Sequence, residues 1–222
     1  MHRQAPDIVD VFERRSAAVG ARLQILSEQS VAEWQTDLPG FVLHNWQLAY
    51  AAFGFVQKRD DLPEITEEKL QATAHVQVPG RMDIHTVQGK TLIMDGAHNG
   101  QKMQAFVAGF KQKYPGQKAA VLLSLKAGKD HQEVLPLLAP ITSELIVTGF
   151  DLKQDTVLHA TDPSELAEEA RAFMSNVTTI DDYNEAYHTL LHAGSDILVV
   201  TGSFYLIGEL RKHHEELRHA RN

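Results

Sequence analysis

The chain has 222 residues, with 21 Lys and Arg side chains against 29 Asp and Glu, so its formal net charge is −8. Because a nucleic-acid interface needs clustered basic side chains, this balance argues against broad nucleic-acid binding. Hydrophobic residues make up 43% of the chain and charged residues 23%, which is the composition of a globular protein. The absence of cysteine excludes disulfides, thiolate metal sites and thiol nucleophiles, and it favours a cytoplasmic location.

Apolar runs are short throughout the chain. The longest, residues 119–125 and 196–202, cannot cross a bilayer and have the length of buried strands. Residues 1–10 lack the apolar core of a signal peptide. We therefore expect neither a membrane segment nor an export signal.

Residues 1–78 have mainly helical patterns. Apolar spacing predicts helices over 6–20, 45–57 and 66–75, and a short strand over 23–26. A stretch of this size with one strand buries too little surface to stand alone, so we interpret it as the end of a larger domain whose sheet is missing. Val78-Pro79-Gly80 breaks the pattern and marks the boundary to residues 79–222.

In residues 79–222, short β-branched runs alternate with helical stretches. The predicted strands cover 91–94, 119–125, 145–148, 177–180 and 197–201. The predicted helices cover 100–114, 132–138, 164–174, 183–192 and 204–218, with Asp162 and the pair Asp181-Asp182 as caps. This alternation is typical of an open α/β domain with a mostly parallel sheet.

Ligands of such sheets bind beyond the carboxyl ends of the strands, and two junctions are equipped for this. After the strand over 91–94 comes Asp95-Gly96-Ala97-His98-Asn99-Gly100. Asp95 there is suited to ribose hydroxyls and His98 to phosphate. The spacing alone equally allows Asp95 and Asn99 to cap the next helix, with His98 on the surface.

The second junction is Thr201-Gly202-Ser203, whose hydroxyls and amides are suited to a carboxylate, although a helix cap explains them slightly better. The loop 126–131 places two lysines, one of them Lys129, after a buried strand, where they either meet phosphate or are solvated. These segments are the remaining candidates for an anion site.

Other motifs are excluded by their spacing. Gly89-Lys90-Thr91 is not a phosphate-binding loop, because the position five residues before Gly89 holds Ile84. The histidine-rich run 212–219 lacks the His-Glu-x-x-His spacing of a zinc site, and the chain has no Gly-x-Ser-x-Gly elbow. We therefore assign no metal ligand and no catalytic nucleophile.

Four segments follow in order along the chain: Val78-Pro79-Gly80-Arg81-Met82-Asp83, Asp95-Gly96-Ala97-His98-Asn99-Gly100, Lys129-Asp130, and Thr201-Gly202-Ser203-Phe204-Tyr205-Leu206-Ile207-Gly208-Glu209. Together they resemble folylpolyglutamate synthase, the folate branch of the Mur ligase family. The first two segments are the specific part. The resemblance implies a Rossmann-like C-terminal ligase domain over 79–222 and a mainly helical remnant of the central ATPase domain over 1–78.

The resemblance also implies an activity, namely ATP-dependent ligation of L-glutamate to the glutamyl carboxylate of folates through an acyl phosphate. Some bacterial members also join glutamate to dihydropteroate. Family residues that match Asn45, Arg81, Asp95 and His98 contact ATP, with Arg81 on phosphate and Asp95 near the ribose. Lys129 is a candidate for a further phosphate contact, and the match of Ser203 suggests a place near the incoming glutamate.

The departures from the family pattern are of two kinds. Val78 replaces a common aromatic residue, and Asp83 stands where Glu is common. The family's phosphate-binding loop, Mg²⁺ ligands and modified lysine lie in an N-terminal domain that has no counterpart in these 222 residues.

This second departure predicts that the chain alone has no ligase activity, as a fragment or as one half of a split ligase with a separate P-loop half. The alternative is a non-catalytic nucleotide- or folate-binding module. A Mur ligase of cell-wall peptides fits the motifs less well.

Overall fold

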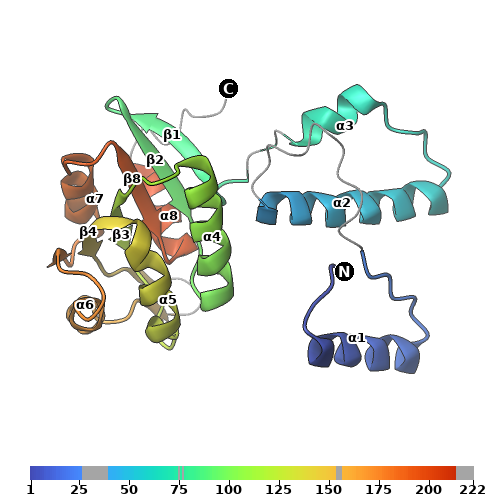
Figure 1. Cartoon of the computed structure of the whole chain (residues 1–222), viewed down its shortest axis with the longest axis horizontal. Helices are drawn as coiled ribbons and strands as arrows, with labels where there is room; N and C mark the ends of the chain where they lie inside the picture. The colour runs from blue at the N-terminus through green and yellow to red at the C-terminus, as the bar shows by residue number, and fades with distance from the viewer. Residues whose placement is uncertain (27–39, 75, 77, 154–156, 214–222) are drawn as a thin grey trace. The chain divides into compact units, whose positions relative to one another are not determined.

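The computed structural model describes residues 1–26, 40–74, 76, 78–153 and 157–213 (Figure 1). The chain divides into two compact units, Met1–Val76 and Gln77–Asn222, and each is described by itself. Within the described ranges, every helix is too short or too polar to pass through a lipid bilayer.

The first unit is helical. Its helices are α1 (Pro6–Val19), α2 (Gly40–Arg59) and α3 (Glu67–Ala74), close to the three predicted ones. The predicted strand over 23–26 is wrong, because only Leu26 pairs, in a single bridge to His2. The indole N–H of Trp46 on α2 donates to Thr73 Oγ1 on α3 at 2.7 Å. Neither α1 nor α2 contains a buried residue, so these helices expose apolar side chains such as Phe12 and Phe55.

The second unit is built on a six-stranded sheet of order β1-β2-β8-β3-β4-β7. Its strands are β1 (Asp83–Val87), β2 (Lys90–Asp95), β3 (Ala119–Leu123), β4 (Thr142–Val147), β7 (Val177–Thr179) and β8 (Ile197–Thr201). All neighbours are parallel except β1, which runs antiparallel to β2. The predicted α/β class with a mostly parallel sheet is therefore confirmed.

Three strands were not predicted from the sequence. A separate antiparallel pair is formed by β5 (Asp151–Lys153) and β6 (Val157–His159). The third unpredicted strand, β1, is joined to β2 by Gln88 and Gly89, whose φ values of 51° and 77° are both positive. Such a pair of residues forms the two-residue turn that matches the twist of a β-hairpin.

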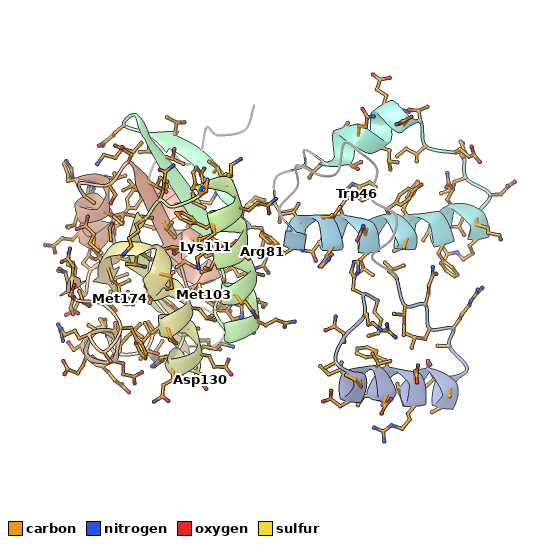
Figure 2. All side chains as sticks on the ribbon, in the orientation of Figure 1. Trp46, Arg81, Met103, Lys111, Asp130 and Met174 are labelled. Atoms are coloured by element: carbon orange, nitrogen blue, oxygen red, sulfur yellow. The ribbon has the colours of Figure 1, made fainter. Side chains whose placement is uncertain are left out.

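Helices cover both faces of the sheet. They are α4 (Gly100–Lys113), α5 (His131–Leu138), α6 (Pro163–Ala170), α7 (Tyr183–Leu191) and α8 (Phe204–His213). Leu92, Leu122 and Leu198 point into one apolar cluster with α7 and α8. Their neighbours in the strands point to the opposite face, where α4 and α5 lie against each other. Met103 of α4, labelled in Figure 2, is fully buried there.

Side-chain caps begin several of these helices. Asp162 accepts from the amides of Ser164 and Glu165 at the start of α6, and Asp182 does the same for α7. The predicted cap at Asp162 is confirmed, and of the predicted pair Asp181-Asp182 it is Asp182 that caps α7. Asn99 and Asp130 cap α4 and α5 in the same way.

Candidate functional site

The carboxyl ends of three central strands meet at one edge of the sheet. Asp95 at the end of β2 is in register with Thr201 at the end of β8, and Thr201 is in register with Leu123 at the end of β3. The segments that follow these strands therefore leave the sheet together. The ends of these strands and the segments after them carry four of the predicted site residues, Asp95, His98, Lys129 and Ser203.

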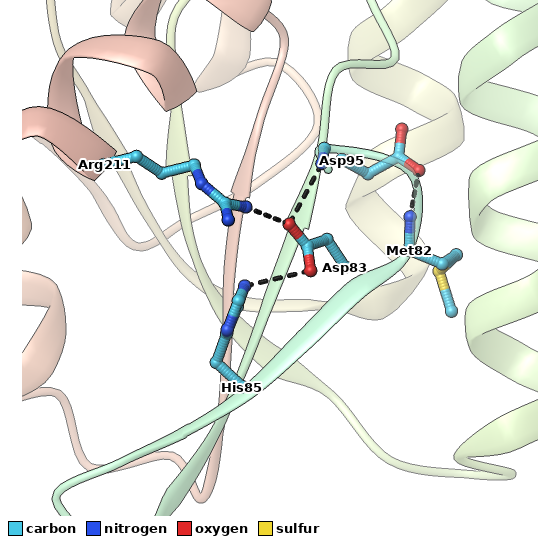
Figure 3. A network of polar contacts seen from close by, with 6 residues as sticks. Met82, Asp83, His85, Asp95 and Arg211 are labelled. Carbon is cyan, nitrogen blue, oxygen red and sulfur yellow. Dashed lines mark hydrogen bonds and ion pairs between the residues drawn. The ribbon is translucent and has the colours of Figure 1, made fainter. Parts of the chain in front are cut away.

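Arg81 lies in a turn whose neighbouring backbone amides are held by buried carboxylates; Figure 3 shows the contact of Met82 with Asp95. The Gly80 amide donates to Asp83 Oδ2 at 3.1 Å, and the Met82 amide donates to Asp95 Oδ2 at 2.9 Å. Gly80 and Met82 have φ values of 72° and 44°, both in the left-handed region. Glycine adopts this conformation without strain, whereas Met82 is held in it by the hydrogen bond of its amide to Asp95. The turn thus presents Arg81 from a fixed backbone.

Asp95 is almost fully buried, at 3% exposure. Its second oxygen, Oδ1, accepts from the Ala97 amide at 2.9 Å. Burial raises the pKa of Asp95 to about 6, against the opposing effect of the two amides and of Arg81. Because both oxygens already accept backbone hydrogen bonds, Asp95 connects the two motifs in this structure, and its contact with ribose stays a prediction.

Asn99, rather than Asp95, caps α4, since its side chain accepts from the Lys102 amide at 3.0 Å. His98 has Nδ1 at 2.8 Å from the Gly96 carbonyl and Nε2 at 3.2 Å from Lys102 Nζ. Both contacts are satisfied when Nδ1 carries the proton and Nε2 accepts from the ammonium group, so we assign that tautomer.

His98 marks an electropositive region. Burial lowers the pKa of His98, and the charges of Lys102, Lys129 and Arg81 lower it further. These three cations act on His98, which lies just before the 14-residue helix α4. In the first turn of α4, the Gly100 amide donates to Glu133 Oε2 at 3.3 Å and the Lys102 amide to Asn99, so the helix adds the positive end of its dipole rather than free amides. The arrangement is suited to bind phosphate groups.

Lys102 was missed by the sequence analysis. The sequence did contain a signal for Lys102: it is a lysine in the first turn of a predicted helix, where a positive charge is unfavourable because it opposes the helix dipole.

Ser203 caps α8. Its Oγ accepts from the amides of Tyr205 and Leu206 at 3.1 Å and 3.4 Å. This geometry agrees with the helix-cap alternative, and a contact with glutamate stays a prediction. Two neighbouring hydroxyls, of Ser124 and Thr201, are buried and have no hydrogen-bond partner among the described residues.

Asp83 organises a buried polar network with His85 and Arg211 (Figure 3). Its Oδ1 lies 3.0 Å from His85 Nε2, and its Oδ2 accepts from Arg211 of α8. Although burial acts to raise the pKa of Asp83, His85, the Gly80 amide and Arg211 together hold it below its ordinary value. Sequence reasoning missed this network, because Asp83 and Arg211 are 128 positions apart.

Two predictions concern places outside this edge. Asn45 is exposed on α2 in the first unit, so its part in a nucleotide site stays a prediction. No group of three His, Asp or Glu side chains that could hold a metal ion occurs among the described residues. Residues 214–219 of the histidine-rich run lie outside them.

Residues 80–204 match the family model described as "Mur ligase, glutamate ligase domain". The chain belongs to the Mur ligase family. The match begins at Gly80 and ends at Phe204, so it spans the turn of Arg81 and all three junctions at the edge of the sheet.

The curated proteins similar to this chain include a dihydrofolate synthetase. A dihydrofolate synthetase of Saccharomyces cerevisiae is 27% identical over an alignment of 239 positions. The alignment covers 95% of this chain and 56% of the yeast protein. The chain thus spans about half the length of this curated relative.

Solved structures of folylpolyglutamate synthases share the fold of this chain. Folylpolyglutamate synthase of Mycobacterium tuberculosis, complexed with ADP and AMPPCP, superposes with a TM-score of 0.76 at 20% identity, covering 95% of this chain and 53% of that one. The bifunctional folylpolyglutamate synthase/dihydrofolate synthase of Yersinia pestis, complexed with AMPPNP and a Mn ion, gives 0.68 at 20% identity, covering 92% and 50%.

Proposed function

We propose that this chain supplies the glutamate ligase domain for ATP-dependent ligation of L-glutamate to folates. The observation that carries the proposal is the gathering of Arg81, Lys102 and Lys129 around His98 and the N-terminus of α4. This cationic edge lies within the segment that matches the Mur ligase family, and the similar proteins are named dihydrofolate synthetase and folylpolyglutamate synthase. Tetrahydrofolate and dihydropteroate are both acceptors to be tested.

The proposed reaction has two steps. An oxygen of the folate carboxylate attacks the γ-phosphorus of ATP, which forms an acyl phosphate and releases ADP. The glutamate amine then attacks the acyl carbon, which forms the amide and releases inorganic phosphate and a proton. Both steps move negative charge, so positioning and charge neutralisation carry the catalysis.

In this scheme the cationic edge binds phosphate oxygens. Arg81 offers a planar fork of N–H donors, and Lys102 and Lys129 add point charges. Asp95 acts by holding the Arg81 turn and the loop of His98 together. The described residues do not fit a metal ion, so we propose that the ligands of any Mg²⁺ lie outside them.

We further propose that residues 1–78 belong with a central ATPase domain and that the 222 residues alone do not ligate. Their sequence contains no phosphate-binding loop. A P-loop polypeptide would also find a surface to pack against, since α1 and α2 bury none of their side chains. The lack of cysteine supports a cytoplasmic location for this assembly.

Calorimetric titration of ATP with Mg²⁺ tests the proposal, first with the chain alone and then, where a P-loop polypeptide is encoded beside it, with that polypeptide added. We expect the chain alone to bind ATP, and Arg81→Ala to weaken that binding by about tenfold, because a charge-assisted pair is lost. Lys111→Ala, a change at the opposite end of α4, serves as the matched control and leaves affinity unchanged.

Ligase activity is measured as glutamate-dependent release of ADP. We expect it only when both polypeptides and a folate or dihydropteroate are present. ADP release by the chain alone would contradict the predicted inactivity. A chain that binds no ATP in either setting would contradict the proposed function and favour a non-catalytic module.

A further inference from the structure

Phe204, the first residue of α8, packs against both glycine-containing segments that surround Arg81. A Cβ atom added to Gly96 would stand 2.6 Å from the Phe204 ring, and one added to Gly80 would stand 2.9 Å from it. Both distances are shorter than real contacts of this kind, so the ring occupies the space that the two missing side chains leave. Phe204 nevertheless remains 37% exposed, which an aromatic side chain with a purely core role would not be.

The exposed ring carries the side chain of Arg81. The guanidinium carbon lies 4.5 Å from the centre of the ring, inside the range of about 6 Å for cation–π contacts. The ring of His98 meets Phe204 edge-on, with 6.4 Å between ring centres and an interplanar angle of 73°. Phe204 therefore contacts both Arg81 and His98, which come from different segments of the chain.

The same helix also holds the backbone of Arg81. Arg211 follows Phe204 by seven positions, or two turns, so both side chains leave the same face of α8. Arg211 pairs with Asp83, whose carboxylate accepts the Gly80 amide next to Arg81. One helix thus fixes both the turn and the guanidinium that the turn carries.

We propose that Phe204 is a positioning residue for Arg81, whose guanidinium it holds beside His98 for pairing with a phosphate group. A guanidinium that is already ordered loses less freedom when it binds, so the ring raises the affinity for the anion. The identity of that anion as a nucleotide phosphate rests on the proposed function. The placement of Arg81 by Phe204 does not.

Nucleotide affinity provides the first test. We expect Phe204→Leu to weaken the binding of ATP with Mg²⁺ to the full chain by about 2- to 30-fold, which is the range of a cation–π contact. Phe204→Tyr keeps the ring and should restore the affinity. In an Arg81→Ala background, Phe204→Leu should cause no further loss. The matched control is Tyr205→Leu, because the neighbouring ring of Tyr205 is also exposed and packs on Phe150.

A second readout needs no nucleotide. In nuclear magnetic resonance spectra, the Nε–Hε signal of Arg81, assigned through Arg81→Lys, should be shifted upfield by the ring current of Phe204. We expect Phe204→Leu to abolish this shift, and Phe204→Tyr and Tyr205→Leu to preserve it. This shift reports whether the Phe204 ring lies against the Arg81 guanidinium, and a change in the stability of the fold alone would not produce it.

The two readouts separate the possible outcomes. An unshifted Arg81 signal in the native chain would overturn the inference whatever the affinity. A shifted signal with unchanged ATP affinity in Phe204→Leu would also overturn it. If the native chain binds no ATP while Arg81 is shifted, the proposed function fails and the placement of Arg81 by Phe204 stands.

Discussion

Two buried carboxylates near Arg81 have opposite electrostatic environments. Asp95 accepts only neutral backbone amides, and burial raises its pKa to about 6. Asp83 is also desolvated, but it has His85 and Arg211 as partners, and its pKa is lowered. The difference between them is the presence of a charged partner in direct contact.

This difference predicts opposite pH dependences of stability. A carboxyl group with a raised pKa stabilises the folded state below its ordinary pKa of about 3.9, and that contribution is lost as the pH rises through about 6. We therefore expect the free energy of unfolding of the native chain, relative to Asp95→Asn, to fall between pH 4 and pH 7 by on the order of 3 kcal/mol. Urea unfolding followed by far-ultraviolet circular dichroism measures it.

Asp83→Asn is the matched control for that experiment. Because the pKa of Asp83 is lowered, its contribution is present above the ordinary pKa and is lost as the pH falls. The free energy of unfolding of the native chain relative to this variant should therefore rise with pH. Equal pH slopes for the native chain and Asp95→Asn would contradict the prediction.

At the scale of the elements, the sequence predicted the central strands and the edge strand β7 well, but it missed the other edge strand, β1. The buried parallel strands β2, β3 and β8 are continuous apolar runs, which a sequence pattern shows directly. In β1 the buried positions include Asp83 and His85, so no apolar alternation is visible. The turn at Gln88 and Gly89 was the available signal.

The candidate site divides in the same way. Asp95 and His98 were predicted because they follow a recognisable strand and lie within one motif. The contacts of Phe204 with Arg81 and of Arg211 with Asp83 join residues more than 100 positions apart. Such contacts depend on the packing of α8 against the first strands, which local sequence does not reveal.

The junction between β8 and α8 depends on a glycine. Gly202 has a φ of 92°, and a Cβ atom there would stand 2.3 Å from the Ser124 carbonyl oxygen. Because backbone at the end of the neighbouring strand cannot move aside cheaply, we expect Gly202→Ala to lower the free energy of unfolding by roughly 2–6 kcal/mol. The urea midpoint of the circular dichroism signal measures this loss.

Gly208, inside α8, is the matched control. Nothing lies within 4 Å of a Cβ atom at this position, and alanine favours a helix over glycine. Gly208→Ala should therefore stabilise the chain by about 0.5–1 kcal/mol. A Gly202→Ala variant that unfolds at the native midpoint would show that the junction tolerates a side chain.

At the scale of the whole molecule, the two units differ in how much apolar surface they bury. Every buried apolar residue of the described chain lies between Met82 and Leu210. The helices α1 and α2 of the first unit contain none. Since burial of apolar surface is the main stabilising contribution in folding, the second unit should be the more stable one.

Intrinsic fluorescence makes this difference measurable. Both tryptophans, Trp34 and Trp46, precede residue 77, so tryptophan emission reports on the first unit, whereas circular dichroism is dominated by the second. We expect the fluorescence transition at a lower urea concentration than the circular dichroism transition, and Trp34→Phe leaves Trp46 on α2 as the sole reporter. Coincident transitions would mean that the two units unfold together. That result would contradict the predicted difference in stability between them.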